Sequence, residues 1–199
     1  RSEPEHRAAA FSCLKAQGFT HALIPDSDEV IEQRLLESLL KIAEHDLADR
    51  VYVEWDTYWK DAGHVVRPRE GFTPCILVNL EKAWNTALRG FEGGRALLLN
   101  EGYGMIHHLS YAGTDERILR KITTWGHRDE VVEGWFERVW KGWDSSRMMR
   151  DLHPTHPRAY GFIEAIEAPQ ALLQAGVESP PRLGLEVPSK WPSVSIVIP

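Results

Sequence analysis

The sequence predicts an α/β fold, a partial mixed sheet that is flanked by helices and followed by a helical segment. Short apolar runs bounded by Gly, Pro or Asp recur along the chain and are typical of strands. Apolar residues at helical spacing follow several of these runs, most clearly over residues 28–46. Strands that alternate with helices, with hairpins in the second half, favour a mixed sheet.

The expected elements follow from these patterns and from the residues that interrupt them. In chain order they are a helix at 4–17, a strand at 21–25, the helix at 28–46, a hairpin at 50–70, a strand at 75–80, a strand pair at 95–100 and 105–111, a helix that begins after Thr114, a Trp-rich helix at 131–143, a rigid turn at 153–157, a helix at 157–166 and a Pro-rich linker at 168–192. Ser27 or Asp28 is expected to cap the helix at 28–46, because a short polar side chain there accepts a hydrogen bond from a free backbone N–H.

The composition of the chain limits the classes of protein to which it can belong. With 199 residues, of which 43% are hydrophobic, the chain is long enough for a real core. Its net charge of -6 argues against a nucleic-acid binder that relies on a basic surface. Cys13 and Cys75 lie far apart without a pairing pattern, which fits a reducing, cytoplasmic compartment. No apolar run approaches membrane-spanning length, and residues 1–7 are too polar for a signal peptide.

Trp is unusually frequent in this chain, and its eight residues are spread over much of the sequence. They stand at 55, 59, 84, 125, 135, 140, 143 and 191. Core packing and helix contacts are one interpretation, since buried indoles dominate many cores. The other is that some indoles form platforms for sugar rings, and the sequence leaves both interpretations open.

The most informative stretch is Ile24-Pro25-Asp26-Ser27-Asp28-Glu29. Asp26 and Asp28 follow an apolar strand and stand one residue apart, so both carboxylates point the same way if the chain stays extended. Two hard oxygen ligands on one side suit Mg²⁺ or Mn²⁺. The alternative is a structural loop, because Asp and Ser are also favoured where a strand leads into a helix.

Four segments together resemble the family 2 glycosyltransferases, which are nucleotide-diphospho-sugar transferases of GT-A fold. Residues 18–29 resemble the strand before an Asp-x-Asp-Glu metal site, and Tyr58-Trp59-Lys60 with Arg67-Pro68-Arg69-Glu70 is similar to a hairpin of bacterial members. The third segment resembles a His-x-Ser-Tyr strand and the helix behind it, and consists of His107-His108-Leu109-Ser110-Tyr111 with Asp115-Glu116-Arg117-Ile118 and Lys121. Residues 193–199 are similar to the first strand of such a domain.

The resemblance covers about residues 5–145 and implies a fragment that lacks the first strands of the fold. Residues 1–145 are then expected to be the C-terminal part of a GT-A-like domain. Residues 146–192 are expected to be a helical, Pro-rich extension and linker. Residues 193–199 would begin a following glycosyltransferase domain in the same parent chain, and the fragment alone is not expected to hold a complete donor pocket.

The resemblance also implies a reaction, the transfer of a sugar from a nucleotide-diphosphate donor to a carbohydrate or other acceptor. A divalent cation, held by Asp26 and Asp28 with His108 as a further ligand, would offset the charge of the leaving diphosphate. Glu29 would bind a sugar hydroxyl or orient the loop; equally, it could only favour the first turn of a helix. For His108 the alternative is an ordinary half-buried histidine.

An inverting transfer needs a carboxylate that accepts the proton of the acceptor hydroxyl. Asp56 and Glu70, on or beside the predicted hairpin, are the candidates for this base, and Glu101 is a further one. Arg67 and Arg69 form a basic edge that would attract the phosphates of the nucleotide sugar, or an ordinary charged edge of a hairpin.

One alternative function and one alternative metal site have to be weighed against this interpretation. A non-catalytic carbohydrate-binding or scaffolding module, derived from such a domain, is permitted by the Trp content. His153 and His156 have a spacing that suits zinc, but no Cys or further His is placed to complete a tetrahedral shell. A structural turn is therefore the favoured interpretation of those two histidines.

Overall fold

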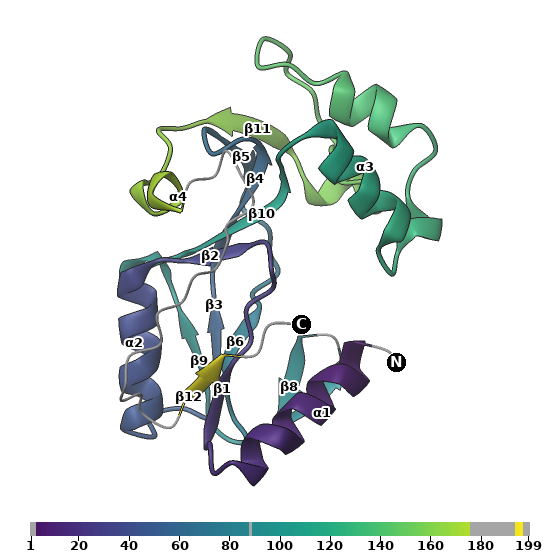
Figure 1. The fold of residues 1–199 in the computed structure, drawn as a ribbon. Helices are drawn as coiled ribbons and strands as arrows, with labels where there is room; N and C mark the ends of the chain where they lie inside the picture. The colour runs from purple at the N-terminus through teal and green to yellow at the C-terminus, as the bar shows by residue number, and fades with distance from the viewer. Residues whose placement is uncertain (1–2, 88, 176–193, 197–199) are drawn as a thin grey trace. The chain divides into compact units, whose positions relative to one another are not determined.

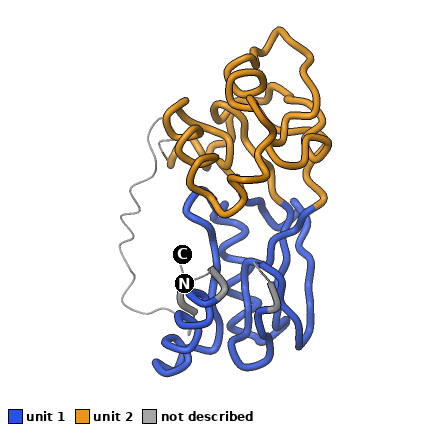
Figure 2. Tube along the Cα trace, turned by 90° about the vertical axis from the view of Figure 1, so that its right-hand side faces the viewer, with its two compact units in different colours: residues 1–54, 72–106, 183–199 blue, residues 55–71, 107–182 orange. Residues whose placement is uncertain are grey.

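The computed structural model describes residues 3–87, 89–175 and 194–196, and the backbone forms two compact units (Figures 1 and 2). Unit 1 comprises residues 1–54, 72–106 and 183–199, and unit 2 comprises residues 55–71 and 107–182. Neither unit is a continuous segment, because the chain leaves unit 1 at Glu54 and returns to it at Phe72. The structure is thus mixed α/β, as predicted, while the expected domain boundaries stay predictions.

Unit 1 is built on a sheet with the strand order β12-β1-β6-β3-β9. Its elements are α1 (Glu3–Ala16), β1 (His21–Leu23), β2 (Glu29–Ile31), α2 (Gln33–Glu44), β3 (Arg50–Val53), β6 (Cys75–Asn79), β7 (Trp84–Ala87), β8 (Gly90–Glu92), β9 (Ala96–Leu99), the 3-10 turn η1 (Glu101–Tyr103) and β12 (Val194–Ile196). β1 pairs with β6 in antiparallel and with β12 in parallel fashion. Phe11 and Leu14 of α1 pack on the sheet against a cluster that includes Ala22, Ile24 and Phe91.

The helix expected at 28–46 begins later than predicted. Residues Glu29–Ile31 form β2, and α2 starts only at Gln33. The β-branched Val30 and Ile31 favour this extended segment. The predicted cap at Ser27 or Asp28 is therefore wrong: Glu32 stands at the N-cap without a side-chain capping bond, and its carboxylate accepts the Met105 N–H instead.

The strands expected to pair at 95–100 and 105–111 lie in different sheets. β9 pairs with β3, whereas β10 (Ile106–Ala112) belongs to the other sheet, so the predicted pair is wrong. Gly104 separates them with φ +104, and a Cβ there would stand 2.7 Å from the Leu35 backbone N. A side chain at this position would therefore clash with α2. The β7–β8 hairpin was not predicted.

Unit 2 contains the strands β11, β5, β4 and β10, in that order. Its elements are β4 (Trp55–Lys60), β5 (His64–Arg67), β10, α3 (Asp115–Thr124), the 3-10 turn η2 (Arg128–Glu130), the π-helix η3 (Phe136–Lys141), the 3-10 turn η4 (Pro157–Ala159), β11 (Phe162–Ala165) and α4 (Gln170–Gln174). The predicted hairpin is β4–β5, in which Tyr58 faces Val65. It is shorter than predicted, because β3 pairs within unit 1.

Three further predictions concern unit 2. Thr114 caps α3, as expected, by accepting the Arg117 N–H at 3.3 Å. The Trp-rich helix is shorter than predicted and is a π-helix over Phe136–Lys141. The prediction of a helix at 157–166 is wrong, because β11 forms there and pairs with β5. The linker at 168–192 lies mostly outside the described residues, apart from α4, and only the central part of the strand at 193–199 is described.

Core packing accounts for four of the Trp residues. Trp59 is fully buried, and its ring contacts the rings of Trp135, Trp140 and Trp143 at centroid distances of 5.1–6.4 Å. This cluster joins β4 to the helical part of unit 2 and confirms the packing interpretation for these indoles. Within the described part of the chain, the helices are too short or too polar to cross a membrane.

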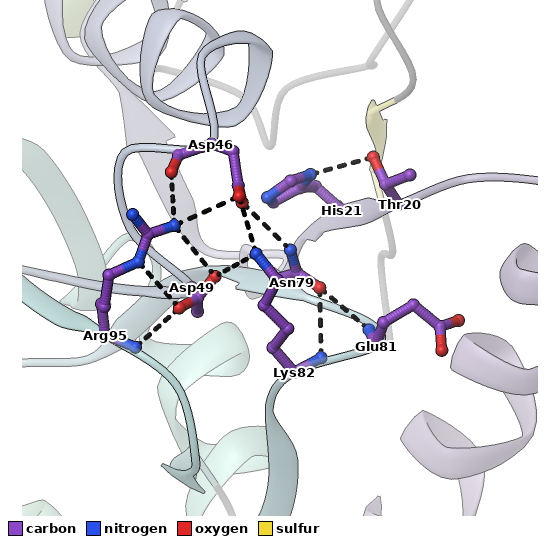
Figure 3. A network of polar contacts seen from close by, with 8 residues as sticks. All are labelled: Thr20, His21, Asp46, Asp49, Asn79, Glu81, Lys82 and Arg95. Atoms are coloured by element: carbon purple, nitrogen blue, oxygen red, sulfur yellow. Dashed lines mark hydrogen bonds and ion pairs between the residues drawn. The ribbon is translucent and has the colours of Figure 1, made fainter.

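A network of charges holds three loops of unit 1 together (Figure 3). Asp46 and Asp49 lie between α2 and β3, Lys82 follows β6, and Arg95 precedes β9. Lys82 Nζ lies 2.7 Å from Asp46 Oδ2, and Arg95 Nε lies 3.1 Å from Asp49 Oδ2. Gly94 is needed beside this network, since it has φ +61 and a Cβ there would meet Asp49 Cβ at 2.4 Å. Hydrogen bonds from Arg95 lower the pKa of Asp49 to about 2, although burial opposes the shift.

Replacing Asp49 with Asn is expected to lower the free energy of unfolding at pH 7 by about 1–2 kcal/mol. This value is smaller than the pKa shift of Asp49 alone would give, because Lys82 and Arg95 are half exposed and water screens their charges. Because the folded-state pKa is depressed, this contribution is present above the unfolded value of 3.8 and is lost as the pH falls toward about 2. Urea denaturation between pH 7 and pH 2 measures the effect. Asp129→Asn, at a 90% exposed side chain, is the control. A difference between wild type and Asp49→Asn that is independent of pH would contradict this assignment.

Candidate functional site

The acidic stretch forms a tight turn after β1. The Glu29 N–H donates to the Asp26 C=O at 3.1 Å and closes the turn. Side chains do not alternate in a turn as they do in a strand, so the expectation that Asp26 and Asp28 point the same way in an extended chain is wrong. Both residues are partly exposed, and the Asp26 side chain keeps 33% of its accessible surface.

Arg89, which precedes β8, holds this turn from inside unit 1. Its Nη1 lies 3.2 Å from Asp26 Oδ2, and its Nη2 donates to the Ile24 C=O at 2.8 Å. The same guanidinium contacts both carboxylate oxygens of Glu29, with Nη1 to Oε1 and with Nη2 to Oε2 at 3.2 Å. A bidentate pair of this kind fixes direction as well as charge. Arg89 therefore sets the shape of the turn.

Glu29 is the inward-facing member of the acidic stretch. Its side chain is 0% exposed, and Oε2 accepts the Asp26 N–H at 3.0 Å. Burial raises the pKa of Glu29, although Arg89 opposes the shift. Of the interpretations open for Glu29, orientation of the loop fits these contacts, and a place in the first helical turn is wrong because β2 begins there.

The second guanidinium on Asp26 comes from α1. Arg7 Nη2 lies 3.2 Å from Asp26 Oδ1, and the Arg7 side chain is 2% exposed. The two carboxylate oxygens of Asp26 thus contact two different arginines. No feature of the sequence pointed to this, because Arg7 lies in a predicted helix and Arg89 lies beside a hairpin that was not predicted.

The residues of the turn have the right chemistry for a hard divalent cation, since Asp26 and Asp28 are carboxylates of half-buried residues, and the Asp26 side chain is 33% exposed. In the part of the chain that the structure describes, however, no group of three or more His, Cys, Asp or Glu residues is arranged to hold a metal. Asp26 already has two cationic partners. A metal would be held by Asp28 together with whichever Asp26 oxygen its arginine releases. The ligand roles of Asp26 and Asp28 stay predictions.

The base candidates differ in their surroundings within unit 2. Asp56 Oδ1 lies 2.7 Å from Arg67 Nη1 and 3.0 Å from Arg69 Nε. Burial opposes ionisation of Asp56, but the hydrogen bonds and the positive charges of the two arginines together outweigh it and lower its pKa. A carboxylate held this way is a weak base. The positive charge of Arg67 is further balanced by Glu164, whose Oε2 lies 2.9 Å from Arg67 Nε.

Glu70 has no arginine partner among its described contacts. Its carboxylate contacts the Thr57 hydroxyl and the Tyr160 hydroxyl, and Lys121 lies close enough to act on its charge. Burial raises the pKa of Glu70 above its usual value, and these three groups only partly offset the shift. A carboxylate with a raised pKa is the better proton acceptor of the two.

The paired histidines of β10 have different neighbours. His107 is buried, and its Nδ1 lies 3.0 Å from the Tyr58 hydroxyl. His108 is half-buried and stacks on Trp55, with a centroid distance of 4.1 Å. His108 belongs to unit 2 and the acidic turn to unit 1, so a place for His108 in a metal shell stays a prediction.

His153 forms the structural turn that its sequence favours. Its Nδ1 accepts the backbone N–H groups of Thr155 at 3.1 Å and of His156 at 2.9 Å. Burial, with His156 and Lys121 nearby, lowers the pKa of His153 to about 4. With Nδ1 used by the backbone, the turn interpretation is confirmed.

Two groups of candidate residues therefore stand in two units. Unit 1 brings Asp26, Asp28 and Glu29 together in the arginine-held turn, and it also contains the exposed Glu101 in η1. Unit 2 contains Asp56, Arg67 and Arg69 in one ionic group, whereas Glu70 is hydrogen-bonded to the Thr57 hydroxyl. Comparison of the sequence with family models finds no match, and neither the curated proteins nor the solved structures give a significant match.

Proposed function

We propose that this chain is a metal-dependent glycosyltransferase module, which takes a sugar from a nucleotide-diphosphate donor and passes it to a carbohydrate or other acceptor. The observation that carries the proposal is the acidic turn at the end of β1. Its shape is set by a buried guanidinium, while Asp26 and Asp28 are half-buried residues and the Asp26 side chain stays 33% exposed. A turn that only connected two strands would not require a buried ionic pair, which is costly to form.

The roles of the residues follow from their surroundings. When bound, Mg²⁺ or Mn²⁺ would offset the charge of the leaving diphosphate. Asp26 and Asp28 would hold the cation, while Glu29 and Arg89 keep the turn in place. Glu70 would accept the proton of the acceptor hydroxyl, because burial leaves it a stronger base than an ordinary glutamate. Asp56 is better suited to orient Arg67 and Arg69.

Binding of Mn²⁺ to the 199-residue chain tests the proposal, with electron paramagnetic resonance as the readout. Asp28→Asn is expected to weaken Mn²⁺ binding by at least about tenfold, because losing even an outer partner of a metal ligand costs about 10–100-fold. Asp129→Asn, in unit 2, should bind Mn²⁺ as wild type does. Equal affinity of wild type and Asp28→Asn removes the metal site. Titration calorimetry with nucleotide sugars, with and without Mn²⁺, then tests the donor.

A second candidate, a non-catalytic carbohydrate-binding module, is favoured by Trp84. Its side chain belongs to β7 and is 58% exposed, whereas Trp59, Trp135 and Trp140 are buried. An exposed indole can pack against a sugar ring. The same calorimetry separates the two functions, since a pure carbohydrate binder should take an oligosaccharide without nucleotide or metal.

A further inference from the structure

The strand β9 forms an open edge of the sheet in unit 1. It pairs with β3 on one side, from Arg50 opposite Ala96 to Val53 opposite Leu99, and in the described part of the chain it is the last strand of this sheet. Its sequence, Ala-Leu-Leu-Leu, contains none of the charged residues or prolines that natural proteins use to block such an edge. The outer side of β9 is therefore a template for one more strand.

Exposed apolar side chains gather at this edge. On β9 itself, Leu97 is 37% and Leu98 is 56% exposed. Among the described residues of unit 1, six large apolar side chains are exposed, and four of them lie on β9 or beside its ends; the six are Leu47, Phe72, Trp84, Leu97, Leu98 and Tyr103. Apolar side chains that gather in one exposed place indicate an interaction surface, whereas single ones do not.

The two ends of β9 carry complementary side chains. Leu47 lies beside the start of the strand, because the guanidinium of Arg95 donates to the C=O of Asp46. The turn η1, which follows the strand, contains Glu101 and Tyr103. Each end thus presents one exposed apolar residue and one exposed charged residue, and the charges of Arg95 and Glu101 are opposite.

A second copy of this chain matches these features when its β9 pairs in antiparallel fashion. In such a symmetric pair, one residue at the centre faces its own copy. With Leu98 at the centre, Leu97 faces Leu99 of the second copy and Arg95 faces Glu101 of the second copy. With Leu97 or Leu99 at the centre, Arg95 faces an apolar residue instead. Charge complementarity therefore selects the pairing about Leu98.

We infer that the edge of β9 is a self-association surface, at which two copies of this chain pair their sheets in antiparallel fashion about Leu98. Arg95 keeps its contact with Asp49 in this arrangement, since its side chain is 55% exposed. Leu47 of each copy comes to the end of the strand where Tyr103 of the other copy lies. The inference does not depend on the proposed function, because it uses neither the acidic turn nor Glu70.

Sedimentation equilibrium of the 199-residue chain over a range of concentrations tests the inference, and we expect a reversible equilibrium between monomer and dimer. Leu98→Lys places two ammonium groups opposite each other at the centre of the pair, and like charges in that position oppose pairing. It should raise the dissociation constant of the dimer at least about tenfold. Leu173→Lys, at a 65% exposed position of α4, is the matched control and should associate as wild type does.

Both substituted side chains are exposed, so both variants should keep the circular dichroism spectrum of wild type. A chain that stays monomeric at every concentration leaves this edge to some other occupant and overturns the inference. Association that is unchanged in Leu98→Lys overturns it as well, because the contact then lies elsewhere on the chain.

Disulfide cross-linking tests the register of the pair. The background is Cys13→Ser, because Cys13 is exposed and could link two copies by itself, whereas Cys75 is buried. In this background, Leu98→Cys should form a linked dimer on mild oxidation, since directly facing Cβ atoms lie about 4.5–5.5 Å apart. Leu97→Cys should not, because diagonal neighbours lie about 7–8 Å apart, beyond the reach of a disulfide. Linkage of Leu97→Cys but not of Leu98→Cys overturns the pairing about Leu98.

Discussion

Replacing Arg89 with Met is expected to lower the free energy of unfolding by about 3–5 kcal/mol, because it leaves the Glu29 carboxylate buried without its cation. The Glu29 side chain is 0% exposed and receives two contacts from Arg89. Met fills most of the volume of the arginine stem, so the loss reports the missing charge rather than a cavity. Urea denaturation followed by far-UV circular dichroism measures it.

The double variant Arg89→Met with Glu29→Gln is the decisive comparison. It removes both charges, and a buried ion pair replaced as a whole costs much less than one that is broken. We expect the double variant to recover most of the stability that the single variant loses. Arg128→Met, whose side chain is 61% exposed, should change stability by less than about 0.5 kcal/mol. A double variant no more stable than the single one would show that the loss comes from the other contacts of Arg89, with Asp26, the Ile24 C=O and its packing neighbours, and not from the Glu29 charge.

The pH dependence of the Arg89→Met effect has a definite sign. Burial already raises the pKa of Glu29, and loss of Arg89 removes the group that opposes this shift. A protonated Glu29 needs no cation, so the deficit of the variant should be largest near neutral pH. It should shrink as the pH falls through the titration of Glu29 in the variant. A deficit that grows on acidification contradicts the assignment of the loss to the Glu29 charge.

The sequence was sufficient where local signals decide the structure. The apolar run before Pro25 forms β1, Thr114 caps α3, and the turn at His153 is made by residues within the same pentapeptide. Prediction from the sequence failed where a pairing partner that is distant in the sequence determines the local structure. Residues 162–165 read as helical, yet they form β11 because β5, almost a hundred residues earlier, offers a free edge.

The same distinction applies to the candidate site. The carboxylates of Asp26, Asp28 and Glu29 could be named from the sequence, because an acidic pair after an apolar strand is a local pattern. Arg89 could not, since it acts on Glu29 from 60 positions away. Nor could the sequence choose between Asp56 and Glu70, which are both acidic residues of one hairpin region. Their different partners, arginines for Asp56 and hydroxyl groups for Glu70, separate them.

Replacing Glu70 with Gln is expected to lower kcat/KM for glycosyl transfer by about 10²–10⁴-fold, the usual contribution of a general base. The amide retains an oxygen that accepts hydrogen bonds from Thr57 and Tyr160, so the local contacts are conserved. The measurement is the transfer rate from the nucleotide sugar found in the binding experiments. Glu137→Gln, at an exposed position of η3, is the matched control and should react as wild type does.

Stability distinguishes a catalytic role of Glu70 from a structural one. Its raised pKa means that the folded state binds the proton more tightly than the unfolded chain, so ionisation of Glu70 costs stability as the pH rises through that value. Glu70→Gln removes this cost and should be as stable as wild type, or more so, at pH 7. A variant that loses rate and stability together would assign Glu70 to the fold.

The pH profile then identifies Glu70 as the group that titrates. The rate of wild type should fall on the acidic side below the raised pKa of Glu70, since only the ionised carboxylate accepts a proton. The hydrogen bond from Tyr160 lowers that pKa, so Tyr160→Phe should move the acidic limb of the kcat/KM profile to higher pH. His153, whose pKa is about 4, and Asp56, whose pKa is lowered, cannot account for such a shift. A limb that stays in place in Tyr160→Phe means that another group takes the proton.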